Sequence, residues 1–283
     1  MFVDSHCHLN FPQYADALDA IRAEMSEAGV DRALCISTTL EEFPQVHALA
    51  TRYDNFWATV GVHPDNEGVQ EPTLEDLVSR ASLPRVVGIG ETGLDYYRLG
   101  ERSVDEMAWQ RDRFRVHIRA ARQTGLPLVI HTRMASDDTL AILKEEGQGE
   151  VRGVFHCFTE SEAVARAALD LGFMISFSGI LTFKNASDLR DVARFVPIER
   201  CLIETDSPYL APAPHRGKTN SPAYVPFVAR QLAELKGLDV NEVGRITSAN
   251  FEDLFSLVRA HRGLAHVRFT AIGREFPTGG TVF

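Results

Sequence analysis

The chain has 283 residues, of which 45% are hydrophobic and 24% charged, and its formal net charge is −10 at pH 7. The length fits one large α/β domain, and the acidic balance argues against a broad basic face that tracks duplex DNA. No apolar run reaches the roughly 20 residues that span a bilayer, and the amino terminus lacks the pattern of a signal peptide. We therefore expect a cytoplasmic protein that makes no contact with membranes.

Short apolar segments alternate with longer amphipathic segments along the chain. The short segments are rich in β-branched residues, which predicts strands, whereas the longer ones show the spacing of helices. The expected strands are 2–6, 33–38, 57–63, 86–91, 127–132, 153–158, 173–179 and 201–206. The expected helices between them include 15–29, 41–53, 106–125, 136–147, 161–172 and 223–237.

Eight strands, most of them followed by a helix, predict a (β/α)₈ TIM barrel. A doubly wound sheet is the alternative, but GIGETG at 88–93 lacks the G-x-G-x-x-G spacing of a dinucleotide-binding loop. We expect a single barrel domain over 1–260. The remaining segment, 261–283, is expected to be a C-terminal tail, and its role does not follow from the sequence.

The first predicted strand leads into two histidines, His6 and His8, in the stretch DSHCHL. Residues two apart on a strand point to the same face, so both imidazoles share one side. Two such histidines alone would more often be solvated side chains at a strand edge. They become half of a metal site only if the rest of the chain supplies further ligands.

Further potential ligands occur where later predicted strands end, and all are imidazoles or carboxylates: His63, Glu91, His131, His156 and Asp206. In a barrel the carboxyl ends of the strands meet at one rim, where the active sites of such enzymes lie. So many ligands predict two divalent ions roughly 3.5–4 Å apart. Glu91 is central in strand order and would bridge them. Asp206 would bind one ion and orient or deprotonate the attacking water.

The ion itself is left open by these ligand types. Imidazole favours Zn, Mn or Ni, whereas carboxylates and water are also compatible with Mg.

The residues above lie in the motifs DSHCHL, GVHP, GIGETGLDYYR, VIHTR, FHCF and ETDSPYLAPAPHRGKTNSP. In this order the motifs resemble those of the TatD family of metal-dependent deoxyribonucleases, and its YcfH-type branch in particular, from residue 1 to about residue 257. The resemblance implies a TIM barrel of the metallo-dependent hydrolase type. It also implies that His63 contacts the substrate. The implied ligands are His6, His8, Glu91 and Asp206 for one ion and Glu91, His131 and His156 for the other.

The resemblance further implies hydrolysis of phosphodiester bonds in DNA, as a 3′→5′ exonuclease on single strands, with two divalent ions (Mg, Mn or Zn) and a metal-activated water. Asp206 and Glu91 would be the catalytic residues. The substrate partner would be a single-stranded DNA end, and no obligate protein partner is evident. The alternative is a hydrolase of another ester or amide, in RNA, aminoacyl-tRNA or a small molecule, on the same binuclear site. A metal-binding scaffold without activity is a third interpretation.

Basic residues near the predicted ligands are candidates for substrate binding. Arg133 follows His131 by two positions and either holds a phosphate or forms an ordinary ion pair. His215 and Arg216 follow Asp206 in a basic stretch that either clamps a nucleic-acid backbone or is a solvated loop.

Two acidic residues and two tyrosines near the ligands have less definite roles. Glu204 shares a face with Asp206 and is expected to support a ligand rather than to bind metal. Asp95 either caps or supports its loop. Tyr96 and Tyr97 either stack on a base or pack beneath that loop.

Overall fold

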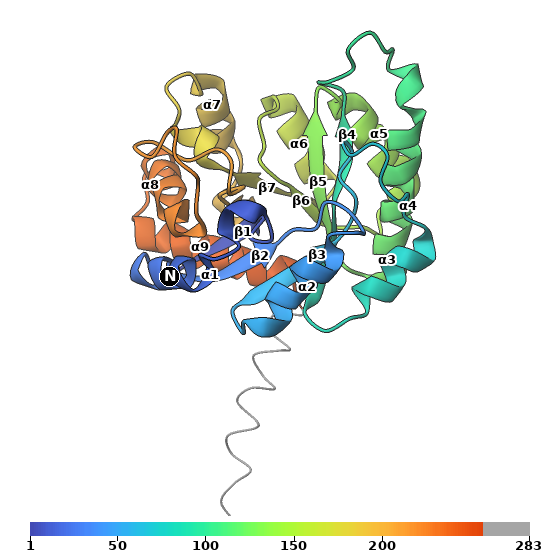
Figure 1. The fold of residues 1–283 in the computed structure, drawn as a ribbon. Helices are drawn as coiled ribbons and strands as arrows, with labels where there is room; N and C mark the ends of the chain where they lie inside the picture. Colours follow the sequence, from blue (N-terminus) through green and yellow to red (C-terminus); the bar gives the residue numbers. More distant parts are fainter. Residues whose placement is uncertain (257–283) are drawn as a thin grey trace, which may run out of the picture.

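The computed structural model describes residues 1–256. Eight parallel strands follow one another in chain order around a nearly closed barrel, with helices on the outside (Figure 1). The predicted TIM barrel is therefore confirmed. The predicted tail over 261–283 lies outside the described residues, so the domain boundary at 260 stays a prediction. The strands are β1 (Phe2–Cys7), β2 (Val30–Cys35), β3 (Phe56–Val60), β4 (Val86–Asp95), β5 (Leu128–Arg133), β6 (Gly153–Phe155), β7 (Met174–Phe177) and β8 (Cys201–Ile203).

Within residues 1–256, nine α-helices and five short 3₁₀ helices lie between the strands or follow the last one. None of these α-helices is long and apolar enough to span a membrane. The α-helices are α1 (Leu18–Glu27), α2 (Phe43–Arg52), α3 (Leu74–Ala81), α4 (Ala108–Thr124), α5 (Ser136–Gly147), α6 (Glu162–Asp170), α7 (Ser187–Phe195), α8 (Val225–Lys236) and α9 (Val240–Leu254). The 3₁₀ helices are η1 (Pro12–Tyr14), η2 (Asp105–Met107), η3 (Gly179–Thr182), η4 (Ile198–Arg200) and η5 (Pro222–Tyr224).

Several strands end earlier than the sequence predicts. β3 ends at Val60, β6 at Phe155 and β8 at Ile203, so His63, His156 and Asp206 lie in the loops that follow these strands. Asp206 has a φ of 55°, in the left-handed region, which a strand residue does not adopt. The placement of Asp206 on the last strand is therefore wrong. The chain bends at the rim, and this bend sets the direction of the carboxylate.

The barrel interior is apolar at one end and polar at the other. Each strand contributes one apolar residue to the lower interior cluster: Val3, Leu34, Trp57, Val87, Val129, Val154, Met174 and Leu202. Phe251, Leu254 and Phe255 at the end of α9 belong to the same cluster, so α9 closes this end of the barrel (Figure 1). On β2 and β4, a step of two residues toward the carboxyl end, which keeps the same face of a strand, reaches Ile36 and Ile89. On the six other strands the same step reaches polar residues. They are Ser5, Thr59, His131, His156, Ser176 and Glu204.

The barrel closes between β1 and the end of β8, and the closure brings together residues about 200 positions apart in the sequence. The Asp206 N–H donates to the His6 carbonyl oxygen (3.0 Å), and the His8 N–H donates to the Ser207 carbonyl oxygen (2.8 Å). Below them the buried Asp4 carboxylate accepts the Thr205 N–H at 2.9 Å. The backbone at this seam therefore holds Asp206 beside both histidines of DSHCHL.

Candidate metal centre

Four ligand atoms converge where the barrel closes. His6 Nε2 lies 3.3 Å from Glu91 Oε2 and 3.6 Å from Asp206 Oδ1. His8 Nε2 lies 3.8 Å and 3.4 Å from the same two oxygens, and the two imidazole nitrogens are 3.3 Å apart. Ligands about 2.1 Å from a tetrahedral ion are separated by about 3.4 Å. The two imidazoles are therefore spaced from each other, and from each of the two carboxylates, as ligands of one ion are.

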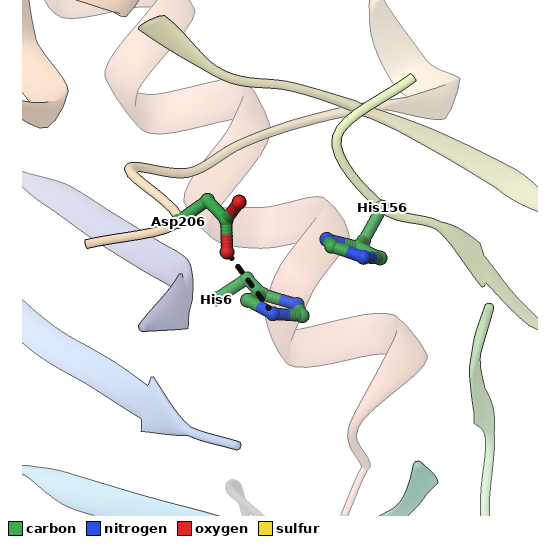
Figure 2. Close-up of side chains that lie close together, drawn as sticks. All are labelled: His6, His156 and Asp206. Atoms are coloured by element: carbon green, nitrogen blue, oxygen red, sulfur yellow. Dashed lines mark ion pairs between the residues drawn. The ribbon is translucent and has the colours of Figure 1, made fainter. Parts of the chain in front are cut away.

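The other oxygen of Glu91 faces a second group of imidazoles. Glu91 Oε1 lies 2.7 Å from His156 Nε2, 3.2 Å from His131 Nδ1 and 3.3 Å from His63 Nε2. Glu91 thus belongs to both groups, one through each oxygen. The rings of His6 and His156, one from each group, lie face to face at 3.8 Å, with Asp206 beside His6 (Figure 2). The two groups therefore form one continuous centre.

Carboxylates behind the second group orient two of its imidazoles. His131 Nε2 donates to Asp95 Oδ2 at 2.9 Å, which leaves the Nδ1 lone pair directed at the centre. His156 Nδ1 donates to Glu204 Oε1 at 3.2 Å, which leaves Nε2 directed there. Such carboxylate–histidine pairs are typical of metal sites. The sequence left the role of Asp95 open, although Glu91 and Asp95 are four apart on β4 and hence share a face.

We expect Glu204→Gln to weaken metal binding by about 10- to 100-fold, because it removes the charge that orients His156 while it keeps the side-chain shape. Isothermal titration of the apoprotein with Mn²⁺ or Zn²⁺ measures this affinity directly. The exposed Glu199 offers a matched control, Glu199→Gln, which should bind metal as the unmodified chain does. An unchanged affinity in Glu204→Gln would contradict the role assigned to this carboxylate.

Both ligand carboxylates are ionised at neutral pH. Burial opposes ionisation of Glu91, but the facing imidazoles, that of His156 above all, outweigh it and hold the pKa of Glu91 well below the usual value. Burial also opposes ionisation of Asp206, and the hydrogen bond from His8 lowers its pKa. Within residues 1–256, the ion pairs of these two carboxylates are all with histidines. A buried anion and a half-buried one, both without a lysine or arginine partner, suit divalent cations.

His63 differs from the other imidazoles in its hydrogen bonds. The Asp65 N–H donates to His63 Nδ1 at 3.0 Å, so the proton of the neutral ring lies on Nε2. Burial lowers the pKa of His63 and favours this neutral form, although Glu91 opposes the shift. The Nε2–H group therefore points at the centre as a hydrogen-bond donor. This geometry suits contact with a substrate oxygen.

A buried arginine on α4 supports the loop that carries His63. The Arg113 Nη1 atom donates to the His63 carbonyl oxygen at 2.8 Å, and its guanidinium pairs with Glu71. One turn later, His117 Nε2 accepts the Val62 N–H at 3.0 Å. Burial lowers the pKa of His117 to about 4, so this ring is neutral. The sequence did not distinguish Arg113 from the other arginines of its helix.

A cavity of about 590 Å³ opens above the two groups of ligands. Arg133 lines it, and its guanidinium lies 3.5 Å from the centre of the Tyr97 ring. His215 and Arg216 are not among its lining residues. The His215 ring stacks on Tyr224 at 4.0 Å, and the Arg216 guanidinium covers Phe183 at 3.7 Å. The structure thus places Arg133 in the lining of the cavity and the two other predicted basic residues outside it.

Comparison with known proteins places this centre in a wider context. Residues 3–256 match the family model described as TatD related DNase. The metal-dependent hydrolase YcfH of Escherichia coli is 47% identical over 259 residues, which cover 90% of this chain and 96% of the relative. The 3′-5′ ssDNA/RNA exonuclease TatD of Salmonella typhimurium is 33% identical over 261 residues, covering 90% and 99% of the two chains. The crystal structure of YjjV, a TatD homologue of Escherichia coli, superposes with a TM-score of 0.83 at 29% identity over 90% of this chain and 98% of its own.

Proposed function

Because the chain belongs to the TatD related DNase family and is a metal-dependent hydrolase, we propose that it cleaves phosphodiester bonds in DNA as a 3′→5′ exonuclease on single strands. The observation that carries the proposal is the position of Glu91, whose two oxygens face two separate groups of ligands. Two divalent ions joined by one carboxylate suit in-line displacement at phosphorus. The name of the Salmonella relative supports the same chemistry at lower identity.

The ligand atoms fit two ions of the Mg, Mn or Zn type, because they are imidazole nitrogens and carboxylate oxygens at spacings suited to coordination. When bound, such ions lower the pKa of water and stabilise negative charge on phosphoryl oxygens. We assign His6, His8, Glu91 and Asp206 to one ion and Glu91, His131 and His156 to the other.

The side chains around the ions position the substrate and move protons. The Asp206 carboxylate accepts the proton of the attacking water, because it is ionised and lies at the wall of the cavity. The His63 Nε2–H group donates to a non-bridging oxygen of the scissile phosphate. Arg133, which is fixed over Tyr97, donates to the neighbouring phosphate. His215 and Arg216 would reach only a longer strand that extends beyond the cavity.

Other esters remain the alternative substrates for this centre. The name of the Salmonella relative includes RNA as well as single-stranded DNA, so an RNA strand is the first comparison to make. Aminoacyl-tRNA and small esters or amides follow. A cytoplasmic location stays a prediction.

The test is digestion of a 5′-labelled single-stranded DNA oligonucleotide by metal-stripped protein, with Mg²⁺, Mn²⁺ or Zn²⁺ added back. We expect a ladder that shortens from the 3′ end, and a chelator should abolish it. Circular single-stranded DNA, which has no end, should stay intact. Immediate release of the label would indicate the opposite polarity. No cleavage by protein that holds its metal would refute the DNase proposal and direct the search to RNA and small esters.

A further inference from the structure

The two sides of the cavity differ in chemistry. Four residues form what we call the apolar wall: Phe11, Ile180, Tyr209 and Leu210. Arg98 and Arg133 form what we call the cationic wall. The loops after β1, β7 and β8 supply the apolar wall, whereas the cationic wall comes from the end of β5 and the loop after β4.

The apolar wall is continuous with the metal centre. The Phe11 ring stacks on the ring of His8, with centroids 4.9 Å apart and planes inclined by 18°. The Tyr209 ring meets Phe11 edge to face at 6.2 Å. Tyr209 is 53% exposed. An aromatic surface therefore begins at a metal ligand and ends at an accessible ring.

Local contacts hold this wall in place. Asn220 Nδ2 donates to the carbonyl oxygens of Tyr209 (2.6 Å) and Thr205 (2.9 Å). A side chain at position 179 would collide with the carbonyl oxygen of Leu210, so only Gly179 allows η3 to pack against this loop. The loops of the apolar wall are thus fixed relative to the metal centre.

The charge distribution indicates which part of a nucleic acid each wall suits. None of the four residues of the apolar wall is a cation, so a phosphate placed there would have to draw Arg98, whose charge acts on Tyr209, away from Asp65. A nucleobase would gain a stacking surface. On the other wall, Arg133 keeps its planar guanidinium over Tyr97, and Arg98 lies 3.5 Å from Asp65. Both arginines can pair with backbone phosphates.

We propose that the apolar wall is the subsite for the terminal nucleoside of a single strand, with its base on Tyr209, and that the rest of the strand leaves across Arg133 and Arg98. This inference rests on the proposed exonuclease function and deepens it. The enzyme then requires a base on the last nucleotide and disfavours a terminal phosphate, because that dianion would lie against the apolar wall.

Equilibrium binding tests the subsite separately from turnover. The probe is a 5′-fluorescein single-stranded DNA whose last linkage is a non-hydrolysable phosphonate, and fluorescence anisotropy with the metal-loaded protein measures its Kd. Three 3′ ends are compared: a normal nucleotide, an abasic tetrahydrofuran residue and a nucleotide with a 3′-phosphate. The variants are Tyr209→Ala, Tyr209→Phe and, as a control at an exposed apolar residue before β4, Leu83→Ala.

We expect the abasic end to bind the unmodified chain about tenfold or more weakly, as loss of one base–aromatic stack predicts. The 3′-phosphate should weaken binding as well. Tyr209→Ala should bind the normal end more weakly than the unmodified chain does, by the same factor that the abasic end costs the unmodified chain. With the abasic end, Tyr209→Ala and the unmodified chain should have the same affinity. Tyr209→Phe should keep the preference for a base, and Leu83→Ala should match the unmodified chain.

Equal affinity of the unmodified chain for the normal and abasic ends would overturn the subsite. This comparison uses only the unmodified chain, so it does not depend on whether a variant folds. The subsite would also be overturned if Tyr209→Ala bound the normal end and the abasic end more weakly by the same factor, because the lost affinity would then not involve the base. In either case, digestion of the hydrolysable strand from its 3′ end would still support the proposed function. Absence of both binding and digestion would refute the proposed function and the subsite together.

Discussion

Glu91→Gln should lower turnover about 10³-fold or more and should remove metal from both ligand groups. Each of its oxygens faces a different group, and an amide supplies neither the charge nor a second anionic oxygen. The loss of a central catalytic group falls in this range. Metal content after dialysis, measured by mass spectrometry, and initial rates on single-stranded DNA report the two effects separately.

The exposed Glu24 on α1 provides a matched control, and Glu24→Gln should keep both its metal and its rate. Retention of two ions per chain by Glu91→Gln would show that Glu91 does not bridge. Circular dichroism of the apoproteins verifies that the variant is folded.

Asp206→Asn should lower kcat by about 10²- to 10⁴-fold, the contribution of a general base. The variant should still bind metal at the second group, because Glu91, His131 and His156 are unchanged. Asp206→Asn is therefore expected to affect one ion, whereas Glu91→Gln is expected to affect both. Metal content and kcat at saturating Mn²⁺ measure the two effects.

Asp170→Asn, at an exposed residue of α6, is the matched control for this change. A rate of Asp206→Asn within tenfold of the unmodified chain would refute the role of this carboxylate as proton acceptor. Loss of all metal from Asp206→Asn would instead mean that the two ligand groups do not bind independently.

The fold could be predicted from the sequence because each strand of a barrel is buried on both faces and therefore appears as a short apolar run. The strand ends were less accurate, since residues 61–63 and 204–206 were expected to belong to strands but lie in the loops after β3 and β8. Helix α3 shows a signal that the prediction did not use. Thr73 and Asp76 form a capping box at its start.

The sequence by itself supplied the candidate ligand types, because imidazoles and carboxylates recur at the ends of the predicted strands. It also determined that a barrel would gather them at one rim. The tertiary structure alone decided how they are arranged. Closure between β1 and β8 places Asp206 beside His6, about 200 positions away, through backbone hydrogen bonds that no local pattern encodes.

The protonated nitrogen of His131 and that of His156 depend on partners distant in the chain, Asp95 and Glu204 respectively. The two walls of the cavity likewise depend on the tertiary structure. The apolar and cationic walls come from loops far apart in the chain, so the sequence contains their residues but only packing decides which side each occupies.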